Sequence, residues 1–201
     1  MNFLSLPHSE ACERNKAPIA EALETHLSER ARVLEVGAGT GQHGEYLAGR
    51  LTHLTWQMTD VPAALPGLNA RQTLAALPNL PRPLPLDLAA PAPEFSADAV
   101  FSANVLHIVA WPLVENLFSA AYGWLAPAGQ LLLYGPFNED GFTSEGNRSL
   151  DRWARDSFPG GGLRELAAVK ELAASQGFED FERMNLPANN LLLRWSRNAA
   201  S

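Results

Sequence analysis

The sequence has little cysteine and no long apolar run, and each shortage excludes a class of protein. The single cysteine, Cys12, rules out an internal disulfide and a cysteine-rich zinc site, and no other metal-ligand cluster is visible. No apolar run reaches the roughly 18 residues needed to cross a bilayer. Residues 1–7 lack the basic start and apolar stretch of a secretory signal. We therefore expect a soluble, cytoplasmic protein with no membrane partner and no metal.

Basic charge is also scarce. The 201 residues carry 15 Lys and Arg against 22 Asp and Glu, which gives a net charge of −7. The basic residues are scattered, whereas an extended nucleic-acid surface needs a concentrated basic stripe. We therefore expect no nucleic-acid partner and favour a small-molecule substrate. The sequence leaves open whether the protein is a monomer or a homodimer.

Helical and strand-like patterns alternate along the chain. Helices are predicted over 12–28, 42–51, 64–77, 112–125 and 163–176, and strands over 32–36, 54–59, 83–86, 99–105, 130–134, 178–184 and 190–195. Connections of helix length imply parallel strands with helices on both faces. The short connection 185–189 can only join antiparallel neighbours.

These patterns predict one α/β domain over residues 1–201. Its fold is expected to be a Rossmann-like three-layer sandwich, with a seven-stranded, mostly parallel sheet and a C-terminal antiparallel hairpin. The polar, glycine-rich segment 138–162 is too long for an ordinary connection. We expect it to be a lid or substrate loop.

The most informative stretch is the turn after the first predicted strand. Three glycines alternate along it: Gly37, Gly39 and Gly41. Glycines let a ligand lie against backbone N–H groups at a helix start, and such turns bind nucleotide-like ligands in open α/β sheets. Carboxylates accompany the ends of three successive strands: Glu35, Asp60 and Asp87.

These features resemble the class I S-adenosylmethionine (SAM)-dependent methyltransferases over nearly the whole chain. The first motif of that superfamily matches Glu35-x-Gly37-x-Gly39-x-Gly41, and Asp60 and Asp87 follow it. A narrower resemblance is to domain-of-unknown-function family 938, a group of short methyltransferase-like proteins. It lies in four separated motifs: residues 11–16 (ACERNK), 41–43 (GQH), 134–137 (YGPF) and 187–191 (PANNL).

The resemblance implies SAM as the cofactor, and the carboxylates suit its parts. We expect Glu35 to accept hydrogen bonds from the ammonium, Asp60 to bind the ribose hydroxyls, and Asp87 with the N–H of Leu88 to bind adenine. The expected cofactor-binding residues are Glu35, Gly37, Ala38, Gly39, Gly41, Asp60, Asp87, Leu88 and Asn104. NAD is a weaker alternative, because Gly39-x-Gly41-x-x-Gly44 fits its glycine pattern but leaves Glu35 and Asp87 unexplained.

Polar residues elsewhere are candidates for the acceptor side. His107 is a candidate general base, because its ordinary pKa lies near 6.5. Tyr134 is a candidate for contact with the cofactor sulfonium. The structural alternative for His107 is a hydrogen bond at the end of a strand, and for Tyr134 it is packing in the core. The candidates for binding a substrate or cofactor carboxylate are Arg14, Asn15, Lys16, Asn189 and Asn190.

Together these features favour a SAM-dependent methyltransferase that acts on an unidentified small molecule. Two alternatives stay open. The protein is an enzyme with other chemistry on SAM itself, or it is a non-catalytic binding module with a methyltransferase fold.

Overall fold

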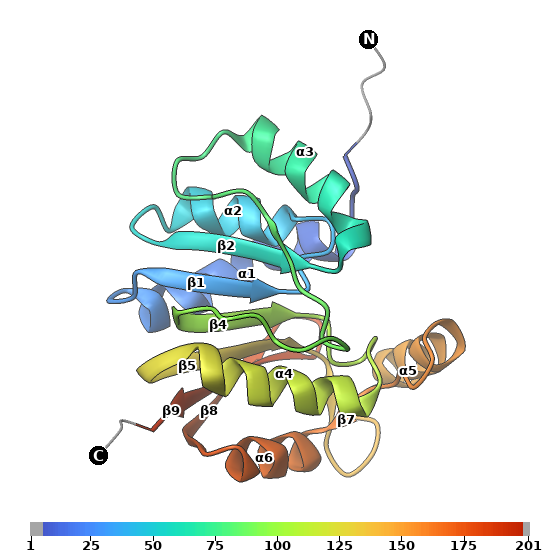
Figure 1. The fold of residues 1–201 in the computed structure, drawn as a ribbon. Coiled ribbons are helices and arrows are strands. Elements are labelled where there is room, and N and C mark those ends of the chain that lie inside the picture. The colour runs from blue at the N-terminus through green and yellow to red at the C-terminus, as the bar shows by residue number, and fades with distance from the viewer. Residues whose placement is uncertain (1–5, 199–201) are drawn as a thin grey trace.

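Seven strands form the central sheet of the computed structural model, which describes residues 6–198 (Figure 1). The strands are β1 (Arg32–Val36), β2 (Thr55–Asp60), β3 (Leu84–Pro85), β4 (Ala97–Ala103), β5 (Leu125–Gly135), β8 (Phe178–Leu186) and β9 (Asn190–Arg197). Their order is β3-β2-β1-β4-β5-β9-β8. Only β9 runs antiparallel to its neighbours, β5 and β8. The predicted seven-stranded sheet and closing hairpin are therefore confirmed.

Helices cover both faces of this sheet, as predicted. One face carries α1 (Glu10–Leu27), α2 (Gln42–Arg50) and α3 (Leu65–Ala75), and the other carries α4 (Trp111–Trp124) and α6 (Leu166–Ser175). A short 3-10 helix, η1 (Pro62–Ala64), precedes α3. None of the helices in residues 6–198 combines the length and apolarity that a membrane crossing requires. Most of residues 1–7, in which no secretory signal was found, lies outside the described residues.

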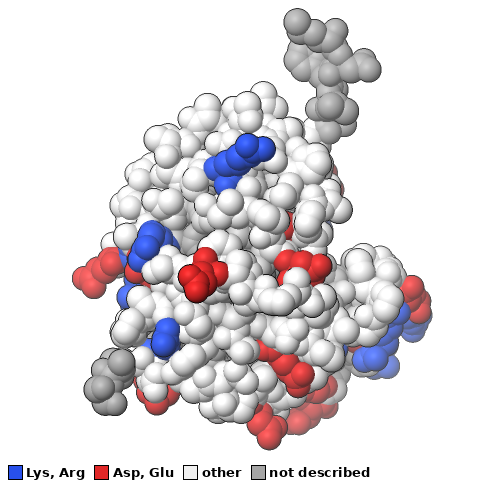
Figure 2. All heavy atoms as spheres, viewed as in Figure 1, with Lys and Arg blue, Asp and Glu red and all other residues white. Residues whose placement is uncertain are grey.

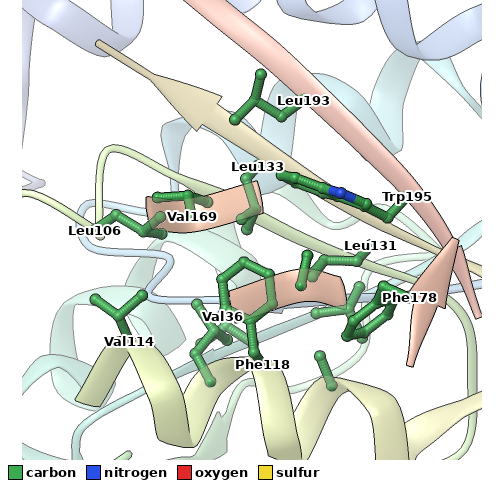
Figure 3. Close-up of a cluster of buried hydrophobic side chains, with 14 of the residues drawn as sticks. Val36, Leu106, Val114, Phe118, Leu131, Leu133, Val169, Phe178, Leu193 and Trp195 are labelled. Carbon is green, nitrogen blue, oxygen red and sulfur yellow. The ribbon is translucent and has the colours of Figure 1, made fainter. Parts of the chain in front are cut away.

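Leucines on β5 show why the sequence pattern leads to a sheet covered on both sides. Leu131 and Leu133 point into the core under α4 and α6, whereas Leu132 enters the core under α1 and α2. Figure 3 shows the first of these cores. There, the ring of Phe118 meets that of Trp195 edge to face, with ring centroids 5.9 Å apart. This packing fixes β5, whose end borders the site described below.

Segment 138–162 differs from the expected loop, because it contains the helix α5 (Glu145–Ser157). The buried side of α5 carries Asn147, Asp151 and Ala154. The amide of Asn147 donates to the carbonyl of Phe137 (3.1 Å), and the carboxylate of Asp151 accepts from the N–H of Leu163 (2.8 Å). Polar residues therefore dock this helix, so the apolar periodicity that reveals other helices is missing.

Several element boundaries also differ from the prediction. β5 begins at Leu125, five residues before the predicted start at residue 130. The last helix begins at Leu166, because the two residues before it form β7 (Arg164–Glu165), which pairs with β6 (Phe137–Asn138). β3 has only two residues, so Asp87 lies just beyond the strand that it was expected to end.

Charged side chains are scattered over the face drawn in Figure 2. Basic groups stand apart from one another over most of it, and at the side where Figure 1 places α5 they mix with acidic groups. This face therefore has no broad basic stripe.

Candidate functional site

A pocket of about 830 Å³ lies at the carboxyl edge of the sheet, where β1, β4 and β5 end. Figure 1 shows α5 at the same edge, toward which the arrows of these strands point. The four sequence motifs named above all contribute to the lining, through residues such as Cys12, His43, Tyr134 and Ala188. Segments far apart in the sequence thus meet around one cavity, at the place where open α/β sheets bind ligands.

The three glycines of the turn have different surroundings. All adopt positive φ, at +74° for Gly37, +58° for Gly39 and +75° for Gly41. A Cβ on Gly37 would collide with the side chain of Val105, and one on Gly41 would lie 2.9 Å from Arg71. A Cβ on Gly39 would enter open space. Gly37 and Gly41 are therefore required for packing, and Gly39 faces the space in which a ligand can lie.

Two polar side chains hold the start of α1 over this turn. The side-chain oxygen of Gln42 accepts from the N–H of Ser9 (2.6 Å) and from the hydroxyl of Thr40 (2.9 Å). The buried guanidinium of Arg71 donates to the carbonyls of Thr40 (2.6 Å) and Pro7 (2.7 Å). Arg71 was not predicted as a site residue. The available signal was its neighbour in the structure, Gln42, which belongs to the motif at 41–43.

Asp60 lies beside the turn, although it is not part of the pocket lining. Its two oxygens accept from the N–H groups of Gly39 (2.6 Å) and Val61 (2.7 Å). A carboxylate has about four lone-pair sites, so each oxygen keeps capacity for a further donor. Asp87, which is exposed, and Leu88 instead border a second cavity of about 700 Å³ beside α4.

Glu35 is buried beneath the turn and is only 1% exposed. Its carboxylate accepts a hydrogen bond from the indole N–H of Trp56 (2.8 Å). Burial raises the pKa of Glu35 to about 7; the Trp56 hydrogen bond opposes this rise, and the charge of Asp60 adds to it. Glu35 is therefore a buried group close to its titration point at neutral pH, and it does not line the pocket.

Three of the titratable side chains that line the pocket have shifted pKa values. Burial lowers the pKa of His107 to about 4, and the charge of Arg164 lowers it further. No hydrogen bond joins the imidazole of His107 to another group among residues 6–198. Burial also lowers the pKa of His43 to about 4, and its Nε2 lies 2.6 Å from the side-chain oxygen of Asn15. Burial raises the pKa of Tyr134 to about 12. At neutral pH both imidazoles are uncharged and the phenol keeps its proton.

The residues expected to bind a carboxylate divide into two groups. Arg14 and Asn190 line the pocket, and Arg14 has no ion pair or hydrogen bond with the described part of the chain. Lys16 instead forms an ion pair within α1 (2.5 Å). The amide of Asn189 donates to the hydroxyl of Thr143 (2.6 Å) and thereby holds the β8–β9 turn against the segment before α5.

Two pocket residues have left-handed backbone without being glycine. Asn104 has φ +59° after β4, and Ala188 has φ +59° in the β8–β9 turn. Asparagine visits this region readily, whereas for alanine it costs about 1–2 kcal/mol. Left-handed backbone also occurs outside the pocket, so it does not by itself mark the site; the other such residues are Ala76, Ala128, Asp140, Asp180 and Asn189.

The pocket thus collects part of the predicted site. The lining includes Arg14, Asn15, Gly37, Ala38, Gly39, Asn104, His107, Tyr134 and Asn190. Outside the lining are Lys16, Glu35, Gly41, Asp60, Asp87, Leu88 and Asn189. One part of the lining was not predicted residue by residue. It is the apolar wall formed by Leu150 and Trp153 of α5 and by Phe158, the residue after this helix. Residues 6–198 contain no cluster of three or more His, Cys, Asp or Glu side chains suited to a metal ion.

Comparison with known families and structures agrees with this fold. The model of the family described as "Protein of unknown function (DUF938)" matches residues 6–197. An O-methyltransferase family protein from Burkholderia thailandensis has a similar structure, with a TM-score of 0.82 and 17% identity over 96% of this chain and 59% of that one. Human N-acetylserotonin methyltransferase, solved in complex with SAM, has a TM-score of 0.81 and 18% identity over 95% and 53% of the two chains.

A third similar structure was solved with a small molecule bound. It is an O-methyltransferase family 2 protein from Planctomyces limnophilus in complex with apigenin, with a TM-score of 0.72 and 17% identity over 92% of this chain and 63% of that one. The present chain therefore spans little more than half the length of these proteins. At such identities the matches establish a class I methyltransferase-like fold.

Proposed function

This chain belongs to the DUF938 family, and we propose that it is a SAM-dependent methyltransferase acting on a small-molecule acceptor. The observation that carries the proposal is the pocket of about 830 Å³, which extends from the glycine turn to the wall provided by α5. A cofactor lying on the turn leaves the rest of this volume for an acceptor. The complexes of similar structures with SAM and with apigenin support both parts of the proposal.

The residues around the turn fit SAM. The open space over Gly39 accommodates a ligand against the backbone. Asp60 retains lone pairs for two ribose hydroxyls, and Asp87 with the N–H of Leu88 is available to adenine. Asn15 lies at the pocket side of the turn, where its amide is a polar partner for a methionine carboxylate.

SAM held over Gly39 and beside Asp60 would supply a methyl group to a lone pair of the acceptor, and the electron pair of the broken bond would stay on sulfur. This chain's own residues align the acceptor, and alignment supplies most of the acceleration in such displacements. The uncharged imidazole of His107 is available to accept a hydrogen bond from an acceptor hydroxyl and so orient it, whereas its pKa of about 4 makes it a weak base. The hydroxyl of Tyr134 stays protonated and is available as a hydrogen-bond donor.

Isothermal titration with SAM and with its demethylated product tests the cofactor. We expect SAM to bind at micromolar concentration. We expect Asp60→Ala to weaken binding about 10- to 100-fold, because hydrogen bonds to a charged group contribute about 1.5–3 kcal/mol. Glu21→Ala, at an exposed position on α1, is the control. Absence of binding at millimolar SAM would refute the proposal.

Mass spectrometry of SAM incubated with the protein alone distinguishes the main alternative. Methyl transfer requires SAM to stay intact until an acceptor is added. Breakdown to products other than the demethylated cofactor would instead indicate chemistry on SAM itself.

A further inference from the structure

The acceptor part of the pocket has an unusual charge balance. Among the described residues that line the pocket there is no Asp or Glu, and Arg14 is the only side chain with a permanent charge. The carboxylates of Glu35 and Asp60 lie outside the lining, on the cofactor side of the turn. An ammonium group of an acceptor would therefore enter the pocket without a counter-charge, which is costly.

Arg14 is available to a ligand. It lies near the start of α1, is exposed, and its guanidinium has no hydrogen bond or ion pair with any group in residues 6–198. Lys16, two residues later, is already paired with Glu13 (2.5 Å). A planar guanidinium with free N–H groups matches a carboxylate, which it binds through two parallel hydrogen bonds.

Apolar side chains form another part of the lining. Leu150 and Trp153 from α5, with Phe158 just after it, provide an aliphatic and aromatic surface. The rings of Trp153 and Phe158 meet edge to face, with centroids 5.3 Å apart. Trp153 is 49% exposed, so much of its ring remains uncovered by the rest of the chain. A flat apolar molecule would cover this surface.

We propose that the acceptor is a small aromatic acid whose ring packs on Trp153 and Phe158 and whose carboxylate binds Arg14. This inference rests on the proposed methyltransferase function, and it specifies the acceptor's charge and shape. His107 lies in the same pocket, where its free imidazole can accept a hydrogen bond from a hydroxyl of such an acid.

Three probes of nearly equal shape test the charge preference: para-hydroxybenzoate, the neutral para-hydroxybenzamide and the cationic para-hydroxybenzylamine. Their affinities are measured by isothermal titration with the free protein and with the protein saturated with demethylated cofactor, so that no turnover occurs. We expect the acid to bind at least about tenfold more tightly than the amide, as a charge-assisted bond implies. We expect the amine to bind most weakly.

The variant Arg14→Gln identifies the group responsible. It should abolish the advantage of the acid over the amide and change the affinity for demethylated cofactor by less than about threefold. Arg152→Gln, which removes an exposed guanidinium of α5 outside the lining, should preserve the advantage. Equal binding of the three probes, preference for the amine, or no binding of the acid at millimolar concentration would overturn the inference.

Loss of cofactor affinity in Arg14→Gln, with the acid's advantage retained, would also overturn it, because Arg14 would then bind the cofactor's carboxylate. The two proposals fail separately. If the demethylated cofactor and SAM do not bind, the proposed function fails, while the probes still report the pocket's charge preference in the free protein.

Discussion

Replacing the buried carboxyl of Glu35 by an amide should change how stability depends on pH. The pKa of Glu35 is raised from 4.5 to about 7, chiefly by burial. Below pH 4.5 the group is protonated in both the folded and unfolded chains. Between pH 4.5 and 7 the unfolded chain ionises first, so the free energy of unfolding falls as pH rises. Above pH 7 both states are ionised and the folded protein carries the whole cost, which is about 3 kcal/mol.

Glu35→Gln removes this dependence. The side-chain oxygen of glutamine still accepts from Trp56, but its added amide N–H groups need acceptors, so the variant is expected to lose about 1–3 kcal/mol at low pH. The decisive quantity is therefore the difference in unfolding free energy between variant and natural protein as a function of pH. That difference should move in favour of the variant by about 3 kcal/mol between pH 4.5 and 8.

Urea unfolding followed by tryptophan fluorescence at several pH values measures this difference. Glu21→Gln, at an exposed position on α1, removes a carboxylate without the burial and should leave the pH dependence unchanged. Parallel curves for Glu35→Gln and the natural protein, within about 0.5 kcal/mol, would show that Glu35 does not titrate in this range in the folded state.

Four further outcomes follow from the geometry. Gly39→Val should abolish SAM binding in isothermal titration, because the valine side chain would fill the open space beside the turn at a position with positive φ. Unchanged SAM affinity in this variant would show that Gly39 is purely structural. Gly123→Ala, in α4 with open space around an added Cβ, should raise the free energy of unfolding by about 1 kcal/mol. The imidazole of His107 should titrate by NMR near pH 4; a midpoint near 6.5 would contradict its burial as the controlling factor. Trp153→Ala should weaken binding of para-hydroxybenzoate about tenfold, because the acid's ring loses the surface on which it packs. The melting temperature and the affinity for demethylated cofactor should stay nearly unchanged, because the Trp153 ring is half-exposed. Equal affinity of the variant and the natural protein for the acid would show that the acid's ring does not pack on Trp153.

The succession of helices and strands, the parallel character of the sheet and the closing hairpin were predictable because they depend on local pattern and connection length. Leu131 to Leu133 are apolar at successive positions, which predicts a strand buried on both faces, and the structure places them in both cores. The five-residue connection 185–189 forced an antiparallel hairpin. Boundaries were less predictable, since β7 exists only through its pairing with β6.

The position of Glu35 shows what the motif did not reveal. Alternation along β1 puts its side chain on the same face as Val33, which packs in the core under α1 and α2. The missing side chain of Gly44 provides the space, since a Cβ there would lie 2.7 Å from the Glu35 carboxylate. The indole of Trp56 completes the site. The alternation of side chains along β1 was visible in the sequence. The hydrogen-bond donor to Glu35 was not, because Trp56 lies on β2 and reaches Glu35 only through tertiary packing.

The four motifs of the family resemblance are explained better by a shared ligand than by the needs of the fold. Most side chains that build the cores, such as Leu131, Phe118 and Trp195, lie outside these motifs, and only Tyr134, Phe137 and Leu191 among the buried core residues belong to them. The motifs instead meet at the pocket, and within it the side chains of Asn15 and His43 bind each other across α1 and α2. A packed fold does not require polar residues from distant segments to line one cavity, whereas recognition of a small molecule does. The wall from α5 lies outside the motifs, so it is the part of the pocket in which acceptor specificity is expected to vary.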